Sequence, residues 1–189
     1  MSVVPILAVS VAADVAITKG ETPAGDRTCL SFGDGTARGT TLRVIDDLPH
    51  LVVESAFGLE RGLWGALARG GFSTPAPPPL RRNGSSRLLT DLSLPRLAER
   101  DWPDLLIARA AVTAVVNRWG DGPDTPDGVR DRMRAHSPEA ADLADGLDDE
   151  SIRVAVAGVR RVYRRWRALP PGGTLRLSWP LDESWLRSQ

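Results

Sequence analysis

One short segment of the sequence, residues 46–54, contains side chains that could take part in chemistry. His50 and Glu54 are four residues apart, so in a helix they lie on the same face. An imidazole and a carboxylate at this spacing can share a divalent metal ion, or the carboxylate can fix the tautomer of the histidine and raise its basicity. Asp46 precedes His50 by four residues and extends the face to three candidate metal ligands, Asp46, His50 and Glu54. Asp47 is then expected to cap the helix or to support these ligands.

The same spacing also has an interpretation without chemistry. Pro49 disfavours helical geometry at the residue before it, which predicts a helix that begins near Asp47 and leaves Asp46 outside it or as its cap. His50 is then a half-buried residue with satisfied hydrogen bonds, and Glu54 is solvated. A His-x-x-x-Glu pair often arises by chance, and the fuller metallopeptidase pattern His-Glu-x-x-His does not occur in the sequence. The residues alone leave both interpretations open.

A second candidate region is residues 151–169, where charge and hydrophobicity separate onto two faces of a predicted helix. Apolar residues recur at helical spacing on one face, and they are Ile152, Val156, Val159, Tyr163 and Trp166. Arginines cover an arc of roughly 160° on the other face. They are Arg153, Arg160, Arg161, Arg164, Arg165 and Arg167.

Four of these arginines define a candidate interaction face, which could contact phosphates or an acidic partner. Its members are Arg153, Arg160, Arg164 and Arg167. The sequence favours a different interpretation, in which the face is solvated or is paired within the molecule. The acids available for such pairing precede the helix, and they are Glu139, Asp142, Asp145, Asp148, Asp149 and Glu150.

Composition argues against several classes of function. The chain has 189 residues, with 24 Lys and Arg against 24 Asp and Glu, so no overall field draws it to nucleic acid or to an anionic membrane. No window reaches the roughly 18 uncharged apolar residues of a membrane-spanning helix. A phosphate-binding loop, a dinucleotide fingerprint and a Gly-x-Ser-x-Gly elbow are missing, so a divalent metal is the one cofactor that the sequence suggests. The single Cys29 fits a reducing compartment and predicts a cytoplasmic protein.

Patterning along the chain predicts a single α+β domain over residues 1–189. Three segments alternate in polarity or are rich in β-branched residues, as the strands of an antiparallel meander are: residues 9–17, 28–32 and 40–45. Residues 174–179 alternate as well and are predicted to pair with this meander. The apolar helix at 102–119 is predicted to lie in the core. We therefore expect a small antiparallel sheet, built from the N-terminal meander and the C-terminal strand, packed against several helices.

Residues 72–87 interrupt the helical patterns. Their prolines at 75 and 77–79 precede a stretch that contains glycine and serine, a composition that disfavours both helix and central strand. We predict a flexible surface loop there, which could close as a lid over the 46–54 segment.

Residues 46–70 resemble part of a group of small uncharacterised bacterial proteins. The stretch that those proteins share reads His-Asp-Leu-x-His-x-x-Val-Glu, then Leu-Gly-Leu, an aromatic-Gly pair and a terminal Gly. The first histidine is replaced by Asp46, and the matching residues that follow are Asp47, Leu48, His50, Val53 and Glu54. Aspartate is a competent oxygen ligand, so the resemblance implies a shared fold and a candidate metal site, without implying a reaction.

Two functions of different classes are consistent with these features. The first is a non-catalytic interaction or regulatory protein, which meets another protein or a second copy of itself rather than nucleic acid or a membrane. The second is a metal-binding protein or a metal-dependent, hydrolase-like enzyme that uses Asp46, His50 and Glu54. We favour the first, because it explains more economically why the sequence contains no complete catalytic set.

Overall fold

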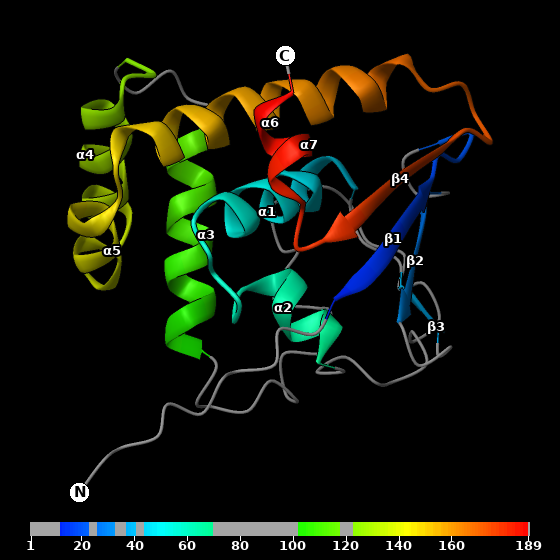
Figure 1. Cartoon of the computed structure of the whole chain (residues 1–189), viewed down its shortest axis with the longest axis horizontal. Coiled ribbons are helices and arrows are strands. Elements are labelled where there is room, and N and C mark those ends of the chain that lie inside the picture. Colours follow the sequence, from blue (N-terminus) through cyan, green and yellow to red (C-terminus); the bar gives the residue numbers. More distant parts are fainter. Residues whose placement is uncertain are drawn as a thin grey trace, which may run out of the picture.

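The computed structural model describes residues 12–22, 26–32, 37–40, 44–69, 102–117 and 123–188. In these ranges an antiparallel sheet stands beside a group of helices (Figure 1), which confirms the predicted α+β class. The strands are β1 (Ala13–Thr18), β2 (Arg27–Phe32), β3 (Ala37–Thr40) and β4 (Thr174–Trp179). The α-helices are α1 (Val44–Ala56), α2 (Leu63–Ala68), α3 (Trp102–Val116), α4 (Pro126–His136), α5 (Ala141–Gly146), α6 (Asp149–Ala168) and α7 (Glu183–Arg187), and η4 (Pro138–Ala140) is a 3-10 turn.

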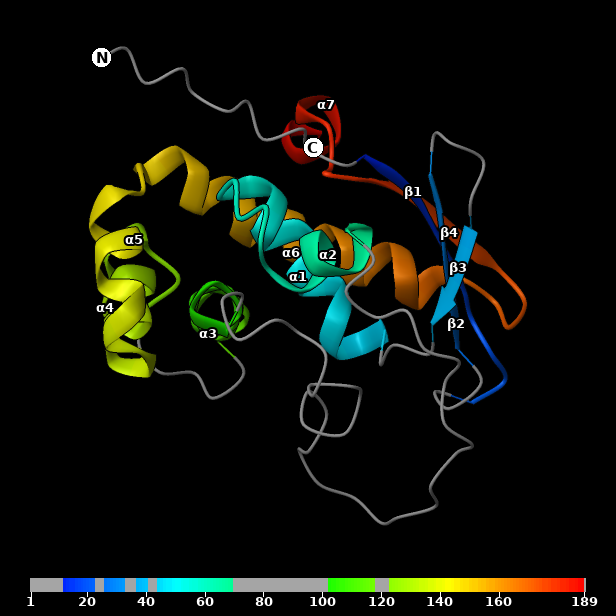
Figure 2. The same ribbon diagram turned by 90° about the horizontal axis from the view of Figure 1, so that it is seen from below.

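The sheet brings the N-terminal and C-terminal strands together. Its order is β3-β2-β1-β4 and every neighbouring pair is antiparallel, so the prediction that residues 174–179 pair with the N-terminal strands is confirmed. Ile17 lies opposite Leu175 and Val15 lies opposite Leu177, and all four side chains are buried on one face. Figure 2 shows the sheet nearly edge-on, with α1, α2 and α6 all on one side of it.

The third strand differs from the prediction. β3 ends at Thr40, whereas the sequence pattern predicts a strand over residues 40–45, and α1 already begins at Val44. A short apolar run fits a buried helix as well as a strand, so periodicity alone does not separate the two. The predicted strand residues 9–11 and the predicted loop 72–87 lie outside the described residues.

Helix α1 begins earlier than predicted and continues through its proline. Because it starts at Val44, Pro49 lies inside it, and the prediction that Asp46 or Asp47 caps the helix is wrong. An interior proline costs about 3 kcal/mol or more. Burial of a large apolar side chain contributes about 1.5–3 kcal/mol, and Leu48, Leu51 and Val52 of this helix are all completely buried. Their packing therefore outweighs the proline.

Helix α3 lies in the core, as its apolar sequence predicts, and ends at Val116. Its Ala108, Ala111 and Ala114 are completely buried, and such small residues let it pack closely against α1 and α4. The longer α6 contacts α4, α3 and α1 and extends to one end of the sheet (Figure 1). Asp148 accepts the N–H of Ser151 at 2.7 Å and caps α6 at its N-terminus. In the described part of the chain, no helix is both long and apolar enough to cross a membrane.

The only lysine of the chain connects β1 to the C-terminus of α6. Nζ of Lys19 donates to the carbonyl oxygens of Trp166 at 3.2 Å, Arg167 at 3.3 Å and Leu169 at 2.8 Å. Carbonyls at the end of a helix have no partner inside the helix, and a positive charge is favourable there. An ammonium group directs three donors from one atom, whereas a guanidinium spreads its donors over a plane. This geometry accounts for a lysine in a chain otherwise rich in arginine.

The assigned orientation of α6 predicts opposite results for two substitutions. Trp166 is 6% exposed in the core, so Trp166→Ala should lower the free energy of unfolding by about 3–5 kcal/mol. Arg164 lies on the exposed side of the same helix, and Arg164→Ala should change it by less than about 1 kcal/mol. Urea unfolding followed by circular dichroism measures both. Equal losses would show that the two faces of α6 are assigned wrongly.

Candidate functional site

His50 and Glu54 contact each other inside the molecule. Nδ1 of His50 is 3.0 Å from Oε1 of Glu54, so the two side chains share one face of α1 as their spacing predicts. His50 is 5% exposed and Glu54 is completely buried. The interpretation in which Glu54 is solvated and His50 half-buried is therefore wrong.

The Glu54 carboxylate caps α2. Its Oε1 accepts the N–H of Leu63 at 2.7 Å, and its Oε2 accepts the N–H of Trp64 at 3.0 Å. These are the first N–H groups of the helix, and they have no acceptor within it. Gly62 stands at the N-cap position and has no side chain that could accept them. A carboxylate from α1 therefore replaces the usual capping side chain, and the positive end of α2 favours its charge.

Gly62 leaves the space that this carboxylate occupies. A Cβ atom on Gly62 would lie 2.2 Å from Cδ of Glu54 and 2.5 Å from each carboxylate oxygen. A larger residue at position 62 would have to displace Glu54 from α2. The preceding turn also needs a glycine, because Gly58 has a φ of 66° where the chain leaves α1. Two glycines thus allow α2 to present its N-terminus to Glu54.

A third hydrogen bond joins α1 to α2 nearer the start of α1. The indole Nε1 of the completely buried Trp64 donates to the carbonyl oxygen of Asp47 at 3.0 Å. Trp64 therefore contacts α1 through both its backbone and its side chain. Asp47 takes part in this contact through its backbone carbonyl.

The interpretation of this site as a metal site depends on which side-chain atoms remain available to coordinate a metal ion. In the ranges that the structure describes, no group of three or more His, Cys, Asp and Glu side chains is arranged to hold a metal ion. The side chain of Asp46 lies outside the described residues, so the ligand set Asp46, His50 and Glu54 stays a prediction. Nε2 of His50 makes no hydrogen bond to any described residue. With the Nδ1 proton directed at Glu54, Nε2 carries the lone pair that binds a metal or accepts a proton.

The first two arginines of the predicted interaction face are paired within the molecule. Arg153 lies 3.1 Å from Asp149, an acid that the sequence offers for this role. Arg160 lies 2.7 Å from Asp124, which is 36 residues earlier in the chain. Sequence patterns among neighbouring residues do not identify such a distant partner. Hydrogen bonds from the Asn117 amide and then from Arg160 hold the pKa of Asp124 below its ordinary value of 3.8. This part of the face is self-paired, as predicted.

The last two arginines of the face behave differently. Arg164 and Arg167 are exposed, and neither makes an ion pair with a described residue. Arg161 must be removed from the exposed arc, because it is 7% exposed and its guanidinium donates to the carbonyl oxygens of Trp185 at 2.9 Å and Leu186 at 3.2 Å. The burial of Arg161 depends on α7, a helix too short to leave a periodic pattern in the sequence.

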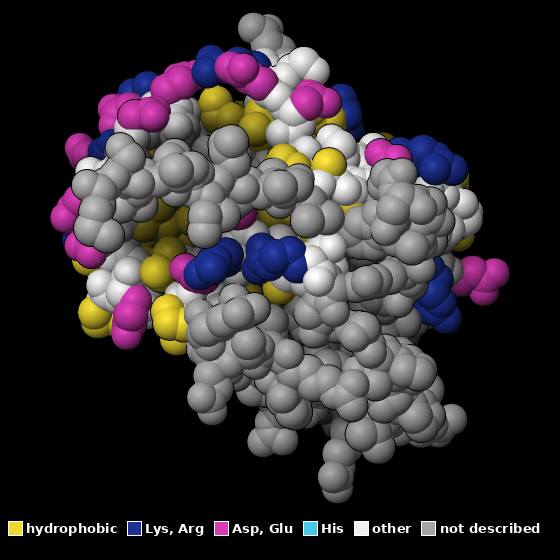
Figure 3. Space-filling view, turned by 60° about the horizontal axis from the view of Figure 1, so that its bottom comes forward, with side chains coloured by type: hydrophobic (Ala, Val, Ile, Leu, Met, Phe, Trp, Pro, Cys, Tyr) yellow, Lys and Arg dark blue, Asp and Glu magenta, His cyan; other side chains and the backbone are white. Residues whose placement is uncertain are grey.

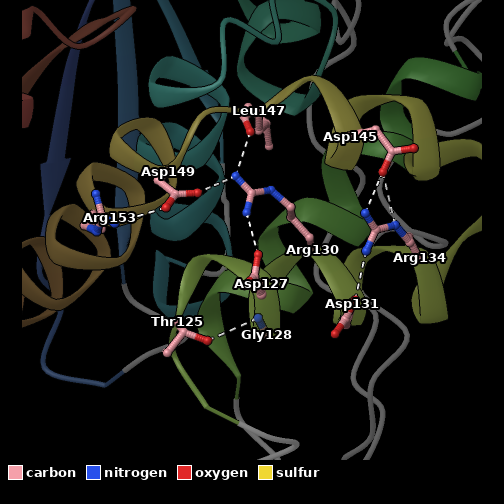
Figure 4. A network of polar contacts seen from close by, with 10 residues as sticks. All are labelled: Thr125, Asp127, Gly128, Arg130, Asp131, Arg134, Asp145, Leu147, Asp149 and Arg153. Atoms are coloured by element: carbon pink, nitrogen blue, oxygen red, sulfur yellow. Dashed lines mark hydrogen bonds and ion pairs between the residues drawn. The ribbon is translucent and has the colours of Figure 1, made fainter.

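Two of the acids before α6, Asp145 and Asp149, pair with arginines of α4 (Figure 4). Arg130 of α4 lies 2.9 Å from Asp127 and 2.6 Å from Asp149, and Arg134 lies 2.5 Å from Asp145. Arg130 also donates to the carbonyl oxygen that precedes the N-cap of α6. The acidic stretch thus fastens α4 to α5 and to the start of α6.

The Glu54 contacts predict a large effect for a change that removes only its charge. Glu54→Gln should lower the free energy of unfolding by about 2–3 kcal/mol, because an amide nitrogen would face a buried N–H donor. Glu60→Gln is the matched control: this glutamate is exposed in the turn before α2, and the change should be within about 0.5 kcal/mol. Thermal and urea unfolding measure both variants. A Glu54→Gln protein as stable as the wild type would refute the capping role.

No protein-family model, no curated protein and no solved structure matches this chain. The resemblance of residues 46–70 to the group of small bacterial proteins therefore stays a prediction, and function is argued from the geometry of the chain itself.

Proposed function

We propose that this protein is a non-catalytic interaction protein, which acts by binding another protein through its surface. The observation that carries the proposal is the complete burial of Glu54, with both carboxylate oxygens bound to backbone N–H groups of α2. Glu54 is thereby committed to holding α1 and α2 together, and His50 is hydrogen-bonded to this committed carboxylate. A catalytic base or metal ligand needs access to its substrate or metal, and His50 is almost as enclosed as its partner.

The surface supports a local binding site rather than a general attraction to polyanions. Figure 3 shows acidic and basic side chains interspersed over the helices along one rim of the molecule. Because charges of both signs alternate there, their fields largely cancel beyond a Debye length of about 8 Å. Recognition through charge must then depend on a small group of side chains. We extend the proposal to a cytoplasmic location, since Cys29 is exposed and unpaired, as suits a reducing compartment.

One observation favours a second candidate function, a metal-binding protein or a metal-dependent hydrolase-like enzyme. Glu54 fixes the orientation of the His50 ring, and a histidine that donates one ring N–H to a carboxylate is typical of metal ligands and general bases. In this alternative His50 is a nitrogen ligand, Glu54 orients it, and Asp46 supplies an oxygen ligand. Either a metal-bound water or the free imidazole would then carry the chemistry.

Metal analysis separates the two functions. Protein purified without an affinity tag is dialysed against zinc or manganese, and bound metal is measured for the wild type and for His50→Asn. The interaction proposal predicts no stoichiometric metal in either protein, because both oxygens of Glu54 are already used. One equivalent of metal in the wild type that His50→Asn loses, with the fold intact by circular dichroism, would refute the proposal and support the alternative.

A further inference from the structure

The last turns of α6 carry positive charge that the rest of the described chain does not neutralise. Arg164, Arg165 and Arg167 are exposed, and no ion pair joins any of them to a described carboxylate. We call these three residues the cationic end of α6. Earlier on the same helix, Arg153 and Arg160 each have an acidic partner. The contrast lies within one helix, so a general excess of arginine does not explain it.

Aromatic rings hold two of these guanidinium groups in place. Cζ of Arg165 lies 5.6 Å from the centroid of the Trp185 ring, and Cζ of Arg167 lies 5.8 Å from the centroid of the Tyr163 ring. Such contacts restrict the motion of an arginine without cancelling its charge. A pre-positioned guanidinium loses less conformational entropy when it binds a carboxylate. Around the helix axis, at about 100° per residue, Arg164 falls between these two and adds a third exposed guanidinium.

The layer beneath the cationic end also has donors without acceptors. Arg161 also contacts the Trp185 ring, with Cζ 5.3 Å from the ring centroid. Its Nε and the indole Nε1 of Trp185 are buried and have no hydrogen-bond partner among the described residues. Burial, and then the charges of Arg165 and Arg164, lower the pKa of Arg161 below that of a free guanidinium. Hydrogen-bond donors and positive charge are therefore in excess at this end, and acceptors are scarce.

The size of the cationic end decides between the anions that it could bind. Residues 164–167 span about 5 Å of helix axis at about 1.5 Å per residue. A duplex-binding protein typically contacts about 6–10 phosphates, and the whole chain has no net charge to add to three arginines. A few carboxylates from an acidic protein segment match this surface better, because each guanidinium can bind one in a bidentate manner.

The acidic partner segment is not supplied well by a second copy of this chain. Its acid-rich region around α4, α5 and the start of α6 already uses Asp127, Asp145 and Asp149 in pairs with Arg130 and Arg134 (Figure 4). Binding to another copy would break these internal pairs. A different protein with free carboxylates has no such cost.

We propose that the cationic end of α6 is the docking site for a short acidic segment, rich in Asp and Glu, of a partner protein. This inference rests on the proposed interaction function and gives it a location and a partner chemistry. Arg164 and Arg167 make the accessible contacts, and Arg165 adds a third from its position on Trp185.

Fluorescence anisotropy with a labelled polyglutamate peptide of about eight residues, about 26 Å long when extended, tests the site. At low ionic strength the double variant Arg164→Ala/Arg167→Ala should bind the peptide about tenfold more weakly than the wild type. The matched control is Arg153→Ala/Arg160→Ala, which removes two exposed but paired arginines from the same helix. This control should bind within about threefold of the wild type.

Four outcomes would overturn the inference. The first is no measurable binding of the peptide by the wild type, and the second is an equal loss of peptide affinity in the two double variants. The third is tighter binding of a duplex DNA of about 20 base pairs than of the peptide, with the same dependence on the arginines. The fourth is a dimer in sedimentation that the Arg164→Ala/Arg167→Ala substitutions dissociate. None of them involves His50 or a metal. Failure of the docking site is therefore distinguishable from failure of the proposed function, which stoichiometric metal on His50 would show.

Discussion

A carboxylate buried away from solvent is stable only where its surroundings supply hydrogen-bond donors and positive potential, and Glu54 finds both at the N-terminus of α2. Several features of the fold depend on this requirement. Gly62 must lack a side chain so that the carboxylate fits, and Gly58 must turn the chain so that α2 approaches from the right direction. Because α1 also packs against α3 and α6, the position that Glu54 fixes for α2 is transmitted to the rest of the helical layer.

The balance between hydrogen-bond donors and acceptors also explains which side chains lie at the two ends of α6. At its N-terminus, Asp148 caps the helix and Asp149 joins Arg130 and Arg153, so acids and bases balance. At its C-terminus, Lys19 satisfies the last carbonyls. Arg165 and Arg167 contact aromatic rings, and Arg161 donates to carbonyl oxygens of α7. The helix dipole favours this order of charges, with acids first and bases last. Terminal backbone groups of α6 thus have partners at both ends, while arginines without an acidic partner among the described residues lie at its C-terminal end.

Local patterns in the sequence predict the features that depend on residues close together in the chain, such as strands, helices and the faces of helices. The strand at residues 174–179, the apolar face of α6 and the contact of His50 with Glu54 follow from periodicity of two or of about 3.6 residues. Contacts between distant segments are not predicted in this way. Leu63 and Trp64 are nine and ten residues from Glu54, Asp124 is 36 residues from Arg160, and the burial of Arg161 requires α7. A helical projection places Arg161 within the polar arc, between Arg164 and Arg165, and only the folded chain shows that α7 covers it.

Amide hydrogen exchange measured by NMR tests the central claim, that Glu54 serves as the acceptor that fixes α2 to α1. If Glu54 is this acceptor, the backbone N–H groups of Leu63 and Trp64 exchange as slowly as core amides of α6 such as that of Val159, through unfolding of the whole domain. A six-residue helix with exposed first N–H groups would instead exchange them rapidly, within the range of the turn residue Glu60. Rapid exchange at Leu63 and Trp64 would contradict the account and free Glu54 for another role.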